Sequence, residues 1–111
     1  MGYVKSKEIL SNLKEGTKIH KSTKGETVIL GVNEDGFEYS IGTKNSKFVT
    51  LEELEWALEK LKSEHCFTRK QYDEKFPIIS KSNPCNFTSI GGLLVTLNYA
   101  SYSRGKYEEV K

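Results

Sequence analysis

The longest helical pattern of apolar side chains lies in the middle of the chain. In the stretch LEELEWALEKLK (residues 51–62) the leucines recur every three or four positions, which is typical of an amphipathic helix. Thr50 and Glu53 have the spacing of a capping box, so the helix is predicted to begin there. A shorter helix is predicted between Ser6, a preferred N-cap residue, and Gly16, a helix stop.

Between these two helices the apolar residues alternate with polar ones, which indicates strands with one buried face. The alternating stretches are TKIHKS (17–22), ETVILGV (26–32) and FEYSI (37–41). Turn signals separate them at Lys24-Gly25 and at Asn33–Gly36. A three-stranded antiparallel meander is therefore predicted, with Lys47–Val49 adding a short fourth strand.

Two further helices are predicted after the long one. Thr68 and Gln71 (TRKQ) form a second capping-box pattern, which predicts a short helix that Pro77 ends. Asn83 and Pro84 have the pattern of an N-cap and a first helical position, so a third helix is predicted from there.

The third helix has an apolar stripe interrupted by two glycines. Phe87, Ile90, Leu94 and Leu97 fall on one face, which is predicted to pack on the leucine-rich helix. Each interior glycine of the pair Gly91-Gly92 costs a helix about 1 kcal/mol relative to alanine. We expect a close approach to compensate, with Gly91 letting the long helix cross tightly.

The last part of the chain alternates around Arg104-Gly105 and is predicted to form a β-hairpin. It carries three tyrosines, namely Tyr99, Tyr102 and Tyr107. Beside Arg104 and Lys106 these rings suit stacking on bases or contact with a partner protein. Alternating tyrosines are also an ordinary feature of a half-buried hairpin, so both interpretations stay open.

Composition and charge restrict the class of protein to which the chain can belong. A chain of 111 residues with 36% apolar and 29% charged residues is expected to form one soluble domain. No apolar run approaches the roughly 20 residues of a membrane helix, so we expect a cytoplasmic protein without a membrane partner. Cys66 and Cys85 are too few for a disulfide scaffold and are expected to be reduced. The net charge is only +2, but residues 75–107 hold four basic groups and no acidic one, whereas the glutamates of residues 51–62 suggest a solvated face.

From residue 50 onward the predicted order is helix, short helix, helix and hairpin. With EHCFTRKQYDEKFP, NPCNFTSIGGLL and the tyrosine-rich hairpin, this half resembles small winged-helix DNA-binding domains. The whole chain, with strands before FVTLEELEWALEKL, is similar to accessory modules of restriction-type endonucleases of bacteria and their phages. We therefore expect an α+β fold in a single domain. Residues 1–49 would hold a helix and an antiparallel meander, and residues 50–111 a winged-helix-like unit of three helices and a hairpin.

The resemblance implies which residues would meet DNA. The outer face of the third helix would lie in the major groove, with Asn86, Thr88, Ser89, Gly92 and Thr96 on it. Phosphate contacts would come from Lys70, Lys81, Arg104 and Lys106, together with the positive end of the helix near Asn83.

The function that follows is non-enzymatic binding of double-stranded DNA, linked to restriction, phage or mobile-element defence. One departure from the family pattern is that no Arg or Lys lies between Lys81 and Arg104, although Arg to guanine is the commonest base contact. An alternative is therefore a protein-binding adaptor or inhibitor that uses the third helix and the hairpin. A small nuclease or hydrolase is a third possibility.

Enzyme and metal chemistry find little support in the residue spacing. His20, His65, Cys66 and Cys85 do not have the spacing of a zinc site. The stretch from Glu109 to Lys111 echoes the Glu-x-Lys of metal-dependent nucleases but has no matching upstream Asp on a strand. We expect no catalytic residue, no metal and no cofactor.

Overall fold

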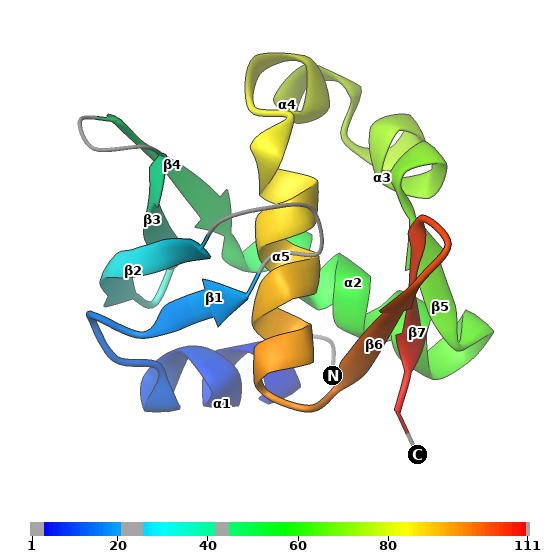
Figure 1. Ribbon diagram of the computed structural model, residues 1–111. Helices are drawn as coiled ribbons and strands as arrows, with labels where there is room; N and C mark the ends of the chain where they lie inside the picture. Colours follow the sequence, from blue (N-terminus) through cyan, green and yellow to red (C-terminus); the bar gives the residue numbers. More distant parts are fainter. Residues whose placement is uncertain (1–3, 21–25, 42–44, 111) are drawn as a thin grey trace.

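Figure 1 shows the computed structural model of the chain, which describes residues 4–20, 26–41 and 45–110. The helices are α1 (Val4–Asn12), α2 (Leu51–Glu64), α3 (Arg69–Lys75), α4 (Pro77–Ser82) and α5 (Cys85–Thr96). The strands are β1 (Lys18–His20), β2 (Glu26–Asn33), β3 (Gly36–Ile41), β4 (Asn45–Thr50), β5 (Cys66–Thr68), β6 (Ala100–Ser103) and β7 (Lys106–Glu109). The turn predicted at Lys24-Gly25 lies outside the described residues.

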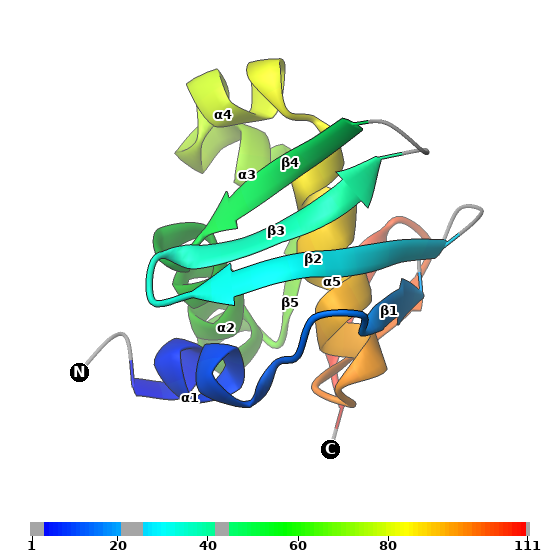
Figure 2. The same ribbon diagram turned by 90° about the vertical axis from the view of Figure 1, so that its left-hand side faces the viewer.

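The strands form two antiparallel sheets, and α5 lies between them (Figure 1). The first sheet is a meander in the order β1-β2-β3-β4, with a bulge between Ile29 and Gly31. Figure 2 shows this sheet spread in front of α5 and α2. The second sheet has the order β5-β7-β6, so the predicted hairpin gains β5 as a third strand. The predicted α+β class, with an amino-terminal helix and a meander, is confirmed.

Both predicted capping boxes are present. The Thr50 side chain accepts from the Glu53 N–H, while Glu53 Oε2 accepts from the Thr50 N–H at 2.9 Å. Thr68 and Gln71 make the same reciprocal pair at the start of α3. These local hydrogen bonds satisfy backbone donors that have no partner inside the helix, and so they fix where α2 and α3 begin.

The region between α3 and α5 differs from the prediction. Pro77 does not simply end a helix, because it occupies the first turn of α4, where its fixed φ fits and its missing N–H is not needed. α5 begins at Cys85 with Pro84 as its N-cap and without a side-chain cap. The predicted capping by Asn83 is therefore wrong, since Asn83 instead ends α4.

Buried side chains from both halves of the chain form one hydrophobic core. Ile19, Ile29 and Val49 of the first sheet belong to the same core as Leu54 of α2 and Leu94 of α5. The face of α2 that was predicted to be solvated is only partly so, because Glu53 is 0% and Glu55 8% exposed. The prediction is wrong for these two because α2 is covered by α1 on one side and by α5 on another.

Gly91 has a specific steric role. A Cβ at this position would lie 2.2 Å from Cζ of the Tyr107 ring, which is far inside van der Waals contact. The close approach predicted for Gly91 exists, but the side chain against it is Tyr107 of β7 and not the long helix α2. The free-energy penalty of the glycine is thus offset by the packing of a buried aromatic ring.

Within the described residues no helix has the length and apolar character needed to cross a bilayer.

Candidate nucleic-acid interface

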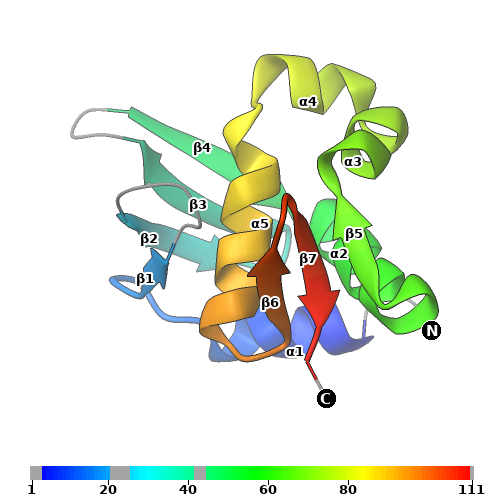
Figure 3. The ribbon, with the colours of Figure 1, turned by 45° about the vertical axis from the view of Figure 1, so that its right-hand side comes forward.

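The turn of the β6–β7 hairpin lies beside the start of α3 (Figures 1 and 3). Strand β7 pairs with β5 so that Lys106 is opposite Thr68, the residue that caps α3. Arg104 and Gly105, with φ of 50° and 83°, form a two-residue loop between the paired residues Ser103 and Lys106. Positive φ at both loop residues matches the twist of a tight hairpin, so the conformation of this turn is well defined.

This arrangement collects basic side chains at one end of the molecule. Lys70 and Arg104 are exposed, and Lys106 is half-buried with its Nζ 3.5 Å from Glu108 Oε2. We call Arg69, Lys70, Arg104 and Lys106 the basic end. Three of these four are residues that the sequence nominated for phosphate contact, and they come from two segments more than thirty residues apart.

Arg69 joins the basic end to the start of α5, and it was not among the predicted site residues. One of its guanidinium nitrogens donates to the Pro84 carbonyl at 2.9 Å, and the group lies 4.8 Å from the centre of the Phe87 ring. Its other terminal nitrogen is 3.9 Å from Asp73 Oδ1. The adjacent Lys70 was nominated from the same stretch, but the contacts of Arg69 depend on α5 packing beside α3, which no local pattern reveals.

The other predicted contact residues, on α4 and α5, lie at different places in the fold. Lys81 is exposed on α4, near Lys47, whose Nζ lies 3.5 Å from the Ser82 carbonyl. Thr88 is half-buried near the start of α5, and its hydroxyl donates to the Cys85 carbonyl at 3.0 Å. Thr96 is half-buried eight residues further on, about 12 Å along the helix from Thr88. Thr88 thus lies at the end of α5 that adjoins Arg69, and Thr96 at the opposite end.

The polar flank of α5 that was expected to face DNA is buried. Asn86 and Ser89 are 0% exposed, and Gly92 is also buried. The prediction that these residues lie on an outer face is wrong. The first sheet packs along this side of α5 through β1 and β4, and it leaves no room there for a duplex.

Asn86 belongs to a hydrogen-bonded network in the core. Its Oδ1 accepts from the Tyr39 hydroxyl at 2.5 Å, and its Nδ2 lies 3.0 Å from both the Phe48 carbonyl and Glu53 Oε1. The Tyr72 hydroxyl also donates to Glu53 Oε1, at 2.5 Å. The network ties the first sheet, α2, α3 and α5 together, and the buried Glu53 carboxylate is compensated by donors from three directions.

Burial also determines the ionisation of the two tyrosines in this network. It raises the pKa of Tyr39 well above its ordinary value of 10.0. Burial raises the pKa of Tyr72 as well, and the hydrogen bond to Glu53 raises it further. Both hydroxyls therefore stay protonated as donors at neutral pH, which is a structural role in the interior.

The three tyrosines of the hairpin region have different surroundings. Tyr107 is 1% exposed and packs on Gly91. Tyr99 is half-buried at the entry to β6. Tyr102 is 43% exposed, with its ring centre 5.1 Å from that of Tyr107. Of the three, Tyr102 presents the largest exposed fraction to a partner.

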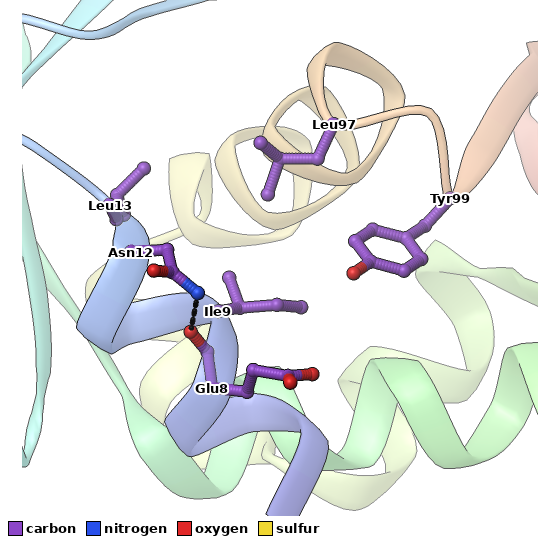
Figure 4. Close-up of a pocket in the computed structure, with 6 residues that line it drawn as sticks. All are labelled: Glu8, Ile9, Asn12, Leu13, Leu97 and Tyr99. Carbon is purple, nitrogen blue, oxygen red and sulfur yellow. Dashed lines mark hydrogen bonds between the residues drawn. The ribbon is translucent and has the colours of Figure 1, made fainter.

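Figure 4 shows a pocket of about 170 Å³ between α1 and the end of α5. It is lined by Glu8, Ile9, Asn12, Leu13, Leu97 and Tyr99. Asn12 Nδ2 donates to the Glu8 carbonyl at 3.0 Å, and Glu8 is the one carboxylate among these residues. The pocket contains Tyr99 but none of the predicted basic contacts, so it is separate from the basic end.

Of the residues weighed for enzyme or metal chemistry, the structure brings His65 and Glu109 together. His65 Nδ1 is 2.7 Å from Glu109 Oε1 at the junction of α2 and β5, while Cys66 and Cys85 are free thiols. Across residues 4–20, 26–41 and 45–110 no three His, Cys, Asp or Glu side chains are placed to hold a metal ion. Lys111, the end of the Glu-x-Lys pattern, lies outside the described residues.

Taken together, the structure brings Lys70, Arg104 and Lys106 to one end, with Tyr102 on the same hairpin. It separates Thr96 from them and places Asn86 and Ser89 in the core. No protein-family model, no curated protein and no solved structure matches the chain.

Proposed function

We propose that this protein is a non-enzymatic module that binds double-stranded DNA by holding phosphates at the basic end. The observation that carries the proposal is the pairing of Lys106 with Thr68, because it places the Arg104 turn beside the start of α3. Cations fixed on a hairpin turn and on a capped helix keep their spacing, so they suit the regular spacing of backbone phosphates.

The distribution of charge supports the same end of the molecule. Residues 69–107 hold six basic and two acidic side chains, a net charge of +4, whereas the whole chain has +2. The rest of the molecule is therefore net negative and would be repelled by DNA. This asymmetry would orient the basic end toward a duplex during encounter.

The burial of Asn86 and Ser89 changes the expected mode of binding. Without these side chains, α5 offers few groups to base edges, so the contacts would be made mainly to phosphates. Binding of this kind has little sequence preference and depends steeply on salt.

Fluorescence anisotropy with a labelled duplex at increasing salt tests the proposal. Three or four phosphate contacts predict a loss of affinity of about 40- to 150-fold between roughly 50 and 200 mM salt. The triple variant Lys70→Glu, Arg104→Glu, Lys106→Glu should abolish binding. The matched control reverses Lys7, Lys14 and Lys62, which are exposed elsewhere and should leave affinity nearly unchanged. Absence of binding at the lowest salt, or equal losses in both triple variants, would contradict the proposal.

A second function, a protein-binding adaptor, is favoured by one observation on α4. Ile78 is 80% exposed, and Pro77 before it is also exposed. The adjacent side chains of Pro77 and Ile78 form a small apolar surface on which a partner protein could pack. Recovery of a stoichiometric protein partner by the wild type, and its loss in Ile78→Ser with DNA binding unchanged, would support this function instead.

A further inference from the structure

Tyr102 is the outermost of three aromatic residues that lie side by side across the second sheet. Phe67 of β5 pairs with Tyr107 of β7, and Tyr107 pairs with Tyr102 of β6. Three aromatic residues thus occupy directly opposed positions on three neighbouring strands. Because β6 is an edge strand, no described strand follows Tyr102 in this sheet.

The two inner residues of the row, Phe67 and Tyr107, support the ring of Tyr102. The Phe67 and Tyr107 rings are stacked, with centres 5.3 Å apart and planes 23° apart. The Phe87 ring of α5 packs against Tyr107 at 5.5 Å. Tyr107 is 1% exposed, whereas Tyr102 is 43% exposed. A partly exposed ring on a buried aromatic support loses little conformational entropy when it binds a ligand.

Polar and positively charged residues lie next to Tyr102 in the sequence. Ser101 and Ser103 flank it in the strand, and Arg104 follows in the turn. Lys106, a member of the basic end, pairs with Ser103. Successive residues of a strand face opposite sides of the sheet, so Ser103 and Lys106 point away from the face that holds Tyr102 and Tyr107. The cation that follows Tyr102 most closely is Arg104 in the turn, which could hold the phosphate of a planar group stacked on the ring.

We propose that Tyr102 stacks on an unpaired nucleobase while the basic end holds the neighbouring phosphates. This inference rests on the proposed function and narrows its ligand. In the interior of a duplex both faces of each base are covered by its neighbours, so the ring of Tyr102 has no base to meet there. The preferred ligand is consequently DNA with a single-stranded nucleotide, such as an overhang or a junction.

The chemistry favours a nucleobase over an aromatic side chain of a partner protein. The turn after Tyr102 holds an exposed arginine. Large apolar side chains, which fill the centre of most protein interfaces, are absent from the described turn and from strand β6. Every base has a π-face, so stacking requires no particular sequence, in keeping with contacts made mainly to phosphates.

The test compares a blunt duplex with the same duplex carrying a short thymine overhang. Wild type should bind the overhang more tightly, and Tyr102→Ala should weaken that binding by about 5- to 150-fold, the range that base stacking contributes. Tyr102→Ala should leave the affinity for the blunt duplex nearly unchanged. Tyr102→Phe keeps the ring and should behave like wild type. Phe48→Ala, at an exposed aromatic of the first sheet, is the matched control.

Two further variants keep the inference testable if Tyr102→Ala does not fold. Tyr102→Trp should keep the ring and report stacking directly, since its fluorescence should be quenched by the overhang and not by the blunt duplex. Tyr102→Thr, a good strand residue, replaces the alanine variant if that one unfolds.

The outcomes separate the two proposals. Equal affinity for the two DNAs, or no effect of Tyr102→Ala and Tyr102→Thr, overturns the stacking inference and leaves phosphate binding in place. Failure of wild type to bind any DNA at low salt overturns both. A protein partner that requires Tyr102, with no DNA bound, overturns both in favour of the adaptor function.

Discussion

Replacing Asn86 by alanine distinguishes a core residue from a DNA-reading residue. In the structure this side chain accepts a hydrogen bond from the Tyr39 hydroxyl and donates to the Phe48 carbonyl and to Glu53. Alanine removes all three contacts at a position that is 0% exposed. A residue on a DNA-binding face would make none of them, and its loss would leave the fold intact.

The expected loss of stability in Asn86→Ala follows from the buried polar groups that lose a hydrogen-bond partner. A buried polar group without a partner costs about 1–3 kcal/mol. The Tyr39 hydroxyl would lose its Asn86 acceptor and the Phe48 carbonyl would lose a donor. Glu53 would lose one donor and keep those from Tyr72 and Thr50. We expect Asn86→Ala to lower the free energy of unfolding by about 3–5 kcal/mol in total. This is a large part of the roughly 5–15 kcal/mol by which a typical domain is stable.

Urea unfolding followed by the fluorescence of Trp56 measures this loss. With a slope of about 2 kcal/mol per molar urea, the midpoint should fall by roughly 2 M. In a Tyr39→Phe background the same substitution should cost less, because the hydroxyl that donates to Asn86 is absent from the start. Thr88→Ala, which loses only a bond to its own helix, is the control. A change within about 0.5 kcal/mol for Asn86→Ala would refute the network and return Asn86 to the list of DNA contacts.

Three further predictions concern the interior. Gly91→Ala should lower the free energy of unfolding by about 1–3 kcal/mol or more in the same urea assay, because its Cβ would collide with the Tyr107 ring. Burial raises the pKa of Glu55 above its ordinary value of 4.5, so the folded protein binds protons more tightly than the unfolded chain and stability falls as pH rises through that range. Glu55→Gln should flatten this dependence in thermal melts between about pH 4 and 7. Because the pKa of Tyr72 is raised above 10.0, stability should fall above pH 10 by about 1.4 kcal/mol per pH unit from this residue alone. Tyr72→Phe should remove that share of the alkaline slope, and an unchanged slope would contradict the burial of the hydroxyl.

Features with short-range causes could be predicted from the sequence. The capping boxes at Thr50 and Thr68 each involve residues three apart, so their spacing alone fixes the starts of α2 and α3. The alternation that predicted the meander is likewise local. Strand β5 was missed because CFT is three residues long, too short to show a period.

The position of α5 could not be predicted, because it depends on contacts between distant parts of the chain. Asn86 has a polar side chain on a polar flank, and such flanks usually face water. Its partners Glu53, Phe48 and Tyr39 lie 33, 38 and 47 residues away, so no local pattern indicates their contact. For Gly91 the sequence indicated a close approach but the predicted neighbour, the long helix, was wrong, because the ring against it belongs to Tyr107. The basic end shows the same limit. Lys70, Arg104 and Lys106 were nominated from the sequence and Arg69 was not, and their meeting depends on the pairing of β5 with β7.

The placement of α5 between the two sheets has a consequence for synthesis of the chain on the ribosome. The inner face of the meander, with Ile19, Ile29 and Val49, is complete long before the helix that seals it has been translated. Until α5 emerges, this apolar surface is exposed to chaperones and to other nascent chains. Slowing translation after β4 should therefore lower the yield of soluble protein.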